Sequence, residues 1–174
     1  MILNRQRRVR VPLSSLEQFL ERVQQIMNVP PDSLAVCLVT DAEIGRWNHT
    51  YRGKDGPTDV LSFPANETNG RANQGRREAK QKGKKVSVPL SRRRNVFSST
   101  SFASSPSSTS YFGDIAIAPA VARRNVRRFR RTLEHEMRLL ILHGAVHLMG
   151  YDHETDHGEM DRLEARLRRR LGLA

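Results

Sequence analysis

Apolar residues follow two patterns that take turns along the chain: short continuous runs, and a spacing of three or four positions. The continuous run 34–40 (LAVCLVT) is typical of a buried strand, and shorter runs predict further strands at 8–11, 58–63 and 111–118. Elsewhere apolar residues recur three or four positions apart, which predicts helices after Pro12, after Asp41 as N-cap, and at about 119–130, 132–149 and 155–171. Strands mixed with helices indicate one α+β or α/β domain, and the pattern leaves the order of the strands open.

Residues 66–110 depart from this pattern because they are polar and poor in large apolar groups. The segment opens with NETNGRANQGRREAKQKGKK and ends with SSTSFASSPSSTS, and residues 86–90 are its one candidate strand. Such a composition buries too little apolar surface to offset the entropy lost on ordering. We therefore predict a disordered, basic and serine-rich insertion at about 66–110 within a single domain of residues 1–174.

The chain is strongly basic, with 30 Lys and Arg against 18 Asp and Glu and a net charge of +12. Residues 66–110 carry ten of the cations and two Glu, and hence two thirds of the net charge. This excess favours a polyanionic partner but does not distinguish RNA, DNA, a ribosome or a membrane surface.

Two further features bear on the compartment. Cys37 is the only cysteine, which excludes an internal disulfide and favours a reducing, cytoplasmic location. No apolar run approaches the roughly 18 residues that a membrane span needs, and no apolar stretch of the secretory kind follows the basic start of the chain. We therefore expect no membrane partner.

Histidines cluster near the C-terminus in HGAVHLMGYDHETDH. His143 and His147 are four positions apart on an apolar helix, so they share one face, and Gly150 is suited to end that helix. The chain can then fold back and bring His153 to the same point. Three converging imidazoles predict a zinc site with an open fourth position, as in catalytic zinc sites. The alternative is that each is an ordinary core or surface histidine, which is our interpretation of His157.

The protease signature H-E-x-x-H places a general-base Glu where this chain has Gly144, which argues against peptide hydrolysis. Glu154 is a nearby carboxylate whose orientation the sequence leaves open. Asp152 could orient a ligand imidazole from outside the set of metal ligands, or it could cap the final helix.

Three segments resemble one known family. HGAVHLMGYDH at 143–153 resembles the H-G-x-x-H-L-x-G-Y-D-H signature of the YbeY family, whose members are rRNA maturation factors described as single-strand endoribonucleases. NHTYRGKDGPTDVLSFP at 48–64 and FGDIAIA at 112–118 agree in order and spacing, so the resemblance covers nearly all of the chain except 66–110. It implies a mixed, roughly four-stranded sheet flanked by helices, with zinc at the C-terminal helices.

The same resemblance implies roles for particular residues. His143, His147 and His153 match the metal ligands of the family, with one Zn²⁺ per chain, and Arg52 matches an arginine of functional importance. The expected partners are rRNA and the small ribosomal subunit. The expected activities are rRNA maturation, notably at the 3′ end of the small-subunit rRNA, and ribosome quality control.

Phosphodiester cleavage needs a nucleophile and groups that stabilise charge on the phosphate. A metal held by His143 and its neighbours can supply bound water as the nucleophile. Arg52 could bind the phosphate through two hydrogen bonds, or it could be a solvated turn residue. Asp59 could orient Arg52 or cap a turn.

An RNA-binding surface can also be predicted. Arg123, Arg127 and Arg131 are spaced four apart, so on one helix they form a stripe that could bind RNA or could simply be a solvated face. Aromatic residues do not alternate with these cations, so base stacking is not predicted, and neither is a DNA partner. Two other functions remain open: a ribosome-assembly factor with a mainly structural zinc, and a metal-dependent hydrolase of another substrate.

Overall fold

The computed structural model describes residues 1–65, 111–129, 131–153 and 156–173. The predicted insertion at 66–110 and its candidate strand at 86–90 lie outside these residues, as does Glu154. Contacts join Met1–Ala65 and Thr109–Ala174 into one compact unit. The elements follow in the order β1 (Ile2–Asn4), α1 (Leu13–Met27), β2 (Leu34–Leu38), α2 (Asp41–Arg52), β3 (Val60–Pro64), β4 (Gly113–Ile117), α3 (Pro119–Phe129), α4 (Leu133–Leu148) and α5 (Glu159–Leu171).

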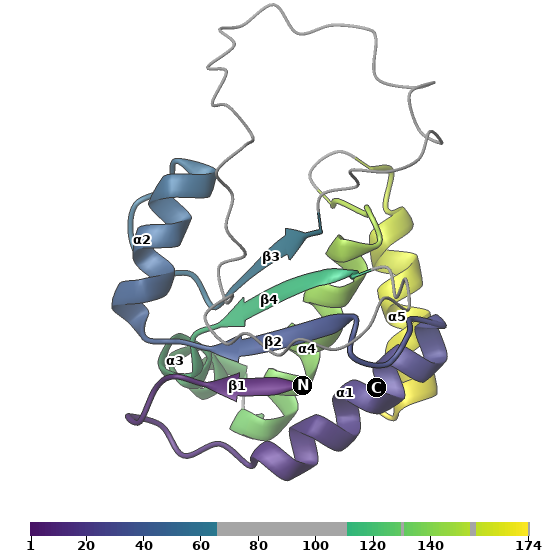
Figure 1. Cartoon of the computed structure of the whole chain (residues 1–174), viewed down its shortest axis with the longest axis horizontal. Coiled ribbons are helices and arrows are strands. Elements are labelled where there is room, and N and C mark those ends of the chain that lie inside the picture. The colour runs from purple at the N-terminus through teal and green to yellow at the C-terminus, as the bar shows by residue number, and fades with distance from the viewer. Residues whose placement is uncertain (66–110, 130, 154–155, 174) are drawn as a thin grey trace, which may run out of the picture. The chain divides into compact units, whose positions relative to one another are not determined.

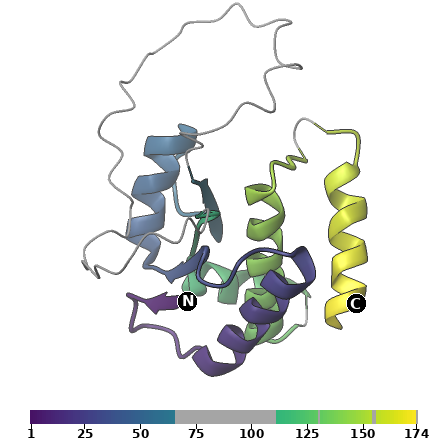
Figure 2. The same cartoon turned by 45° about the vertical axis from the view of Figure 1, so that its right-hand side comes forward.

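The strands form one mixed sheet in the order β1-β2-β4-β3 (Figure 1). β1 pairs parallel with β2, β2 pairs parallel with β4, and β3 pairs antiparallel with β4. Figure 2 shows the sheet between α2 on one side and α4 and α5 on the other. The predicted four-stranded α+β fold is confirmed.

The hydrophobic core lies between the sheet and the helices α1, α4 and α5. Alternate residues of the central strands, among them Val36, Leu38, Ile115 and Ile117, point into it and are fully buried. The buried faces of the helices complete it with Leu16, Phe19, Leu20, Met137, Ile141, Leu142 and Met160. The described part of the chain contains no helix that is both long and apolar enough to span a membrane.

The predicted first strand was wrong. The strand is Ile2–Asn4, which pairs with Val36–Leu38. At 8–11 the chain forms a loop instead, because the side chain of Gln6 accepts from the amide of Val9 and donates to its carbonyl, both at 2.9 Å. These bonds replace the partners that a neighbouring strand would have provided.

The start of α2 also differs from the prediction. The N-cap is Thr40 rather than Asp41: its hydroxyl accepts from the amide of Glu43, and the carboxylate of Glu43 accepts from the amide of Thr40. This reciprocal pair is a capping box. Asp41 is the first helical residue, and its carboxylate forms an ion pair with Arg124 of α3 at 2.8 Å.

The ends of β3 and β4 lie side by side on either side of residues 66–110. Pro64 is opposite Gly113 in the antiparallel pair, and the amide of Ala65 donates to the carbonyl of Phe112 at 3.2 Å. The long segment is therefore inserted between two paired strands, at the place where a short hairpin turn would be sufficient.

Candidate metal centre

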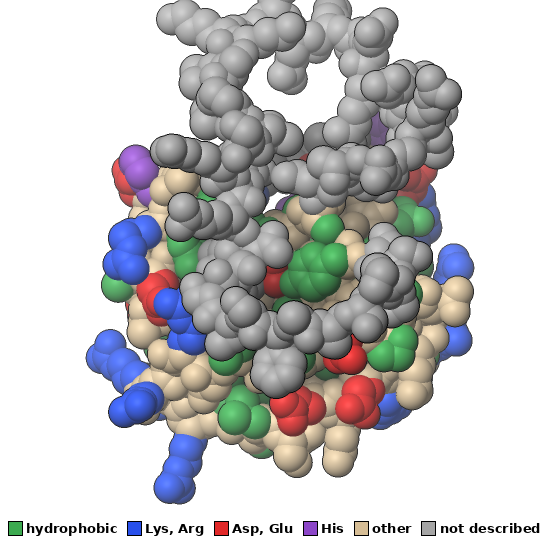
Figure 3. Space-filling view, viewed as in Figure 1, with side chains coloured by type: hydrophobic (Ala, Val, Ile, Leu, Met, Phe, Trp, Pro, Cys, Tyr) green, Lys and Arg blue, Asp and Glu red, His purple; other side chains and the backbone are tan. Residues whose placement is uncertain are grey.

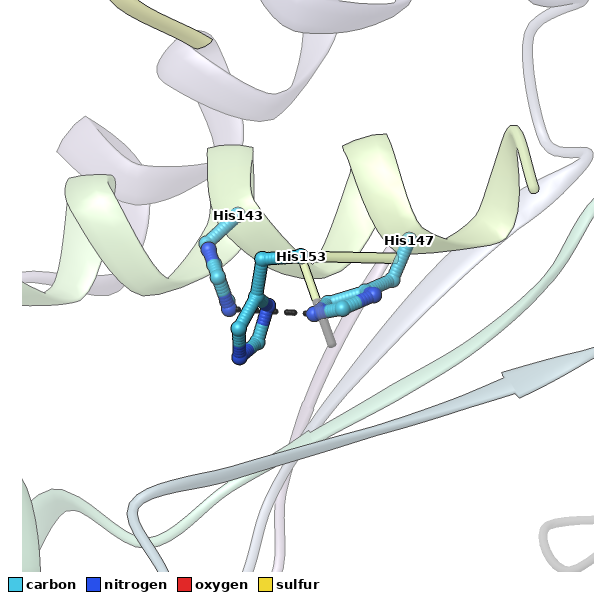
Figure 4. A group of neighbouring side chains, drawn as sticks. All are labelled: His143, His147 and His153. Carbon is cyan, nitrogen blue, oxygen red and sulfur yellow. Dashed lines mark hydrogen bonds between the residues drawn. The ribbon is translucent and has the colours of Figure 1, made fainter. Parts of the chain in front are cut away.

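Helix α4 brings His143 and His147 together on one side (Figure 4). The helix begins at the N-cap Thr132, whose hydroxyl accepts from the amide of His135. One turn of helix separates the two histidines, and their Nε2 atoms are 3.1 Å apart. Both side chains are half-buried.

A tight turn after α4 brings His153 to the same point. Gly150 has a φ of 90°, which glycine adopts without strain, and its amide donates to the carbonyl of His147 at 2.9 Å. The ring of His153 lies 5.7 Å from that of His143 and 5.3 Å from that of His147, measured between centroids. One nitrogen from each ring lies within 4.8 Å of the others. The predicted convergence of the three histidines is therefore present, and His157 is not part of the group.

Two hydrogen bonds fix the orientation of the half-buried rings. The Nδ1 of His147 donates to the carbonyl of Tyr151 at 2.9 Å, and the Nδ1 of His143 donates to a carboxylate oxygen of Glu164 at 3.1 Å. The other oxygen of Glu164 accepts from Arg168 at 2.5 Å. With Nδ1 engaged in both rings, the two Nε2 atoms are left to face a metal.

Glu164 was missed from the sequence because it lies 21 residues beyond His143 on another helix. A signal was nevertheless present. Glu164 occupies the face of α5 that otherwise carries Met160, Leu167 and Leu171, and all four side chains are buried. A carboxylate at such a position needs a partner, since burying an unpaired charge is costly.

The electrostatics favour a neutral imidazole at His147 and a charged carboxylate at Glu164. Burial and the neighbouring His143 lower the pKa of His147, although the carbonyl of Tyr151 and the charge of Asp152 partly oppose them. Burial alone would raise the pKa of Glu164, but the hydrogen bond and charge of His143 and the guanidinium of Arg168 lower it overall. A neutral imidazole is the form that binds metal.

The spacing of His143 and His147 fits a zinc ion. Two nitrogens bound to zinc at 2.0–2.1 Å in a tetrahedral arrangement lie about 3.3 Å apart, close to the 3.1 Å between the Nε2 atoms of His143 and His147. His153 is exposed, so the third ligand lies at the solvent side of the group. Among the described residues, no fourth histidine, cysteine or carboxylate joins the group, which leaves a coordination position for water or substrate.

The structure explains why position 144, between the two histidines of α4, is a glycine. A Cβ atom at Gly144 would lie 2.8 Å from Cγ2 of Ile115 and 3.1 Å from the hydroxyl of Ser62. That hydroxyl donates to the carbonyl of Gly144 at 3.2 Å, so helix and sheet are in direct contact at this point. A glutamate of the protease type does not fit there.

The other predicted site residues lie on three different segments of the chain. Arg52 is the last residue of α2, with an exposed side chain. The carboxylate of Asp59 accepts from Thr58 at 3.2 Å and from Asn125 of α3 at 3.1 Å. Asp152 precedes His153 in the chain, and the N-cap of the final helix is Gly158.

The carboxylate of Asp156, two residues before that N-cap, accepts from the amides of Gly158 and Met160 at 2.8 and 2.7 Å. Capping by Asp152 was therefore wrong, and α5 begins at Glu159, four residues after the predicted start at 155.

The predicted arginine stripe was wrong in part. α3 ends at Phe129, so Arg131 lies beyond the helix, where its guanidinium is 3.9 Å from Glu136. Arg123 is exposed on α3, and the side chain of Arg127 lies outside the described part of the structure.

Comparisons with known proteins agree with this geometry. The family model described as Endoribonuclease YbeY matches residues 1–172. Proteins named Endoribonuclease YbeY include one from Solibacter usitatus, 33% identical over 161 residues, which cover 91% of this chain and 79% of the relative. Another, from Koribacter versatilis, is 32% identical over 173 residues, which cover 99% of this chain and 86% of the relative.

The fold has a counterpart among solved structures. The solution structure of a protein from Thermotoga maritima matches with a TM-score of 0.51 and 24% identity, over 98% of this chain and 89% of the other, which supports the fold alone. The family-model match over nearly the whole length and relatives above 30% identity show that this chain belongs to the endoribonuclease YbeY family.

Proposed function

We propose that this chain is a zinc-dependent endoribonuclease that cleaves single-stranded RNA during rRNA maturation, including the 3′ end of the small-subunit rRNA, and in ribosome quality control. Its partners are then rRNA and the small ribosomal subunit, and its location is the cytoplasm. The observation that supports this proposal most strongly is the convergence of three imidazoles, two with Nδ1 held by a hydrogen bond, in a chain of the endoribonuclease YbeY family.

His143, His147 and His153 would hold one zinc ion per chain. Bound zinc supplies a Lewis acid for a phosphate oxygen and lowers the pKa of water. The carbonyl of Tyr151 and the carboxylate of Glu164 hold the Nδ1 atoms of His147 and His143, so that their Nε2 atoms would be available as ligands. Burial lowers the pKa of His147, which favours the neutral ring that binds metal.

The openness of the group favours catalysis over a purely structural role. Structural zinc sites are closed by four protein ligands, whereas the described residues provide three. The exposure of His153 gives a phosphate a route to the ion. An assembly factor with a structural zinc is therefore less well supported.

Arg52 is the proposed phosphate ligand. Its side chain is exposed at the end of α2, where Gly53 adopts the left-handed conformation and ends the helix. A guanidinium can donate two parallel hydrogen bonds to a phosphate and carries its charge at any physiological pH. Arg52 would thus bind the scissile phosphate and stabilise the charge that develops on it.

The test is metal analysis combined with cleavage of a defined single-stranded rRNA fragment. Wild type should hold about one zinc per chain and cleave the RNA. His143→Ala should lose zinc and cleavage together, whereas Arg52→Ala should keep zinc and lose most of its cleavage. His49→Ala is the control, because His49 is an exposed histidine paired with Asp55 outside the cluster.

Cleavage at the wild-type rate by both His143→Ala and Arg52→Ala would overturn the proposal. His147→Ala separates the catalytic from the structural role of zinc. A catalytic site predicts that this variant stays folded and inactive, whereas a structural zinc predicts that it unfolds.

A further inference from the structure

Three aromatic side chains meet beside β3, the edge strand of the sheet. Phe63 of β3 contacts Trp47 of α2, with ring centroids 6.1 Å apart and planes at 87°. It also contacts Tyr51 of α2, at 5.2 Å and 75°. The sequence did not reveal this group, since α2 and β3 are separate elements that only the fold brings together. We call Trp47, Tyr51 and Phe63 the aromatic platform.

Tyr51 is the exposed member of the aromatic platform. It is 47% exposed, while Trp47 and Phe63 are half-buried. In an edge-to-face pair, one ring presents an edge to a face of the other, so Phe63 leaves at least one face of the Tyr51 ring uncovered. An exposed aromatic ring that is held in place by a neighbouring ring can stack on a flat, unpaired base.

Two cations of α2 flank Trp47 and Tyr51 in the sequence. Arg46 lies exposed on α2 and Arg52 directly follows Tyr51. In the view of Figure 3, Lys and Arg side chains lie along the edge of the molecule where α2 and the loop after β1 run. Positive charge beside an open aromatic ring suits a ligand that alternates flat bases with phosphates.

β3 connects the aromatic platform to the histidines. Ser62 and Phe63 are successive residues, so their side chains point to opposite faces of the sheet. Ser62 donates to the carbonyl of Gly144, next to His143, while Phe63 points towards α2. β3 is the edge strand of the described sheet, so an RNA strand that contacts both faces would have to pass along this edge.

We propose that the aromatic platform stacks an unpaired base of single-stranded RNA on Tyr51, while Arg46 and Arg52 bind the adjacent phosphates. This inference rests on the proposed function, because it names the surface that receives the substrate. It predicts a preference for single strands with little preference for base identity, since every base has a face that can stack. A duplex, whose bases are already stacked, should bind more weakly.

The test compares two short RNA strands with phosphorothioate linkages that slow cleavage: an oligoadenylate and its abasic counterpart, which has the same charge and no bases. Binding is followed by the fluorescence of Trp47, the only tryptophan of the chain. Tyr51→Ala should weaken binding of the oligoadenylate by roughly 5- to 100-fold and leave binding of the abasic strand within about twofold. Tyr51→Leu should behave like the alanine variant, and Tyr51→Phe like wild type.

The matched control is Leu3→Ala. Leu3 is an exposed apolar residue on β1, the opposite edge strand, and its replacement should change neither affinity. If Tyr51→Ala and Tyr51→Leu bind the oligoadenylate as wild type does, the aromatic platform serves a different partner and this inference is wrong. If wild type binds the oligoadenylate but cleaves no RNA, and both Tyr51 variants lose that binding, the aromatic platform stands and the proposed endoribonuclease activity fails.

Discussion

At the scale of single residues, Glu164 is a buried carboxylate near the candidate metal centre that needs a partner for each of its oxygens. One carboxylate oxygen accepts from His143 at 3.1 Å and the other from Arg168 at 2.5 Å, and the side chain is buried. Arg168 thus orients the carboxylate of Glu164, which in turn orients the ring of His143. A partner of this kind raises the basicity of a metal-binding imidazole and limits its rotation.

Replacement of Glu164 should weaken zinc binding without a change of ligand. We expect about tenfold weaker binding in Glu164→Gln, which keeps the shape and an acceptor oxygen, and up to about 100-fold weaker binding in Glu164→Ala. Competition with a chromophoric chelator measures both. Asp161→Asn, an exposed carboxylate on the same helix, is the control. Wild-type affinity in both Glu164 variants would show that the hydrogen bond has no effect on the metal.

At the scale of elements, the approach of α4 to the sheet depends on the absence of one side chain. Gly144 lies against Ile115, which is fully buried and has little room to move. Gly45 in α2 is a useful comparison, since a Cβ atom there would lie 3.6 Å from the nearest atom, an ordinary contact distance.

Alanine should therefore have opposite effects at the two glycines. Gly144→Ala should lower the free energy of unfolding by about 1–3 kcal/mol, because the added methyl group overpacks the contact with the sheet. Gly45→Ala should raise it by about 0.5–1 kcal/mol, because alanine is the better helix former. Urea unfolding of the metal-free protein measures both, and stabilisation in both variants would contradict the tight contact at Gly144.

The capping box of α2 should make stability depend on pH. Burial would raise the pKa of Glu43, but hydrogen bonds with Thr40 and the charges of Arg5 and Arg46 lower it below the ordinary 4.5. A lowered pKa means that the unfolded chain binds this proton more readily. The contribution of Glu43 is therefore complete above about pH 4.5 and is lost as the pH falls through the folded-state pKa.

Glu43→Ala should cost about 1 kcal/mol of unfolding free energy at pH 7, and this difference from wild type should shrink between pH 5 and pH 3. Denaturant unfolding across that range is the measurement. Glu17→Ala removes an exposed carboxylate from α1 and should differ from wild type by less than about 0.5 kcal/mol. A difference for Glu43→Ala that does not vary with pH would exclude the charge of Glu43 as its source.

At the scale of the whole molecule, residues 66–110 lie in the chain between the paired strands β3 and β4, and we expect that the sheet forms without them. Its flanking residues Ala65 and Phe112 are joined by a backbone hydrogen bond at the end of the β3–β4 pair. The segment also carries ten Lys and Arg against two Glu. Its role, like its predicted disorder, stays a prediction.

Replacing residues 66–110 with a short Gly-Ser turn should leave folding and zinc binding intact. Stability should rise by up to about 2 kcal/mol, because a shorter loop costs less entropy to close. RNA binding at low salt should weaken, and the dependence of log K on log salt should become less steep by about 0.7 for each phosphate that the shortened chain no longer neutralises. A salt dependence equal to that of wild type would show that these cations do not bind RNA.

The sequence alone was sufficient where the interactions are local. The four-residue spacing of His143 and His147 and the helix-ending Gly150 depend on the geometry of one helix and one turn, and both were predicted. So was each helix, apart from shifts at the ends. The first strand was misplaced because the side chain of Gln6 competes for the backbone of Val9.

Only the tertiary structure decided which distant residues meet. Glu164 reaches His143 because α5 packs on α4, and Phe63 reaches Tyr51 because α2 lies against β3. A side chain at Gly144 would collide with Ile115, which belongs to β4. A spacing pattern reports which residues share a face, whereas the partner of that face depends on how the elements pack.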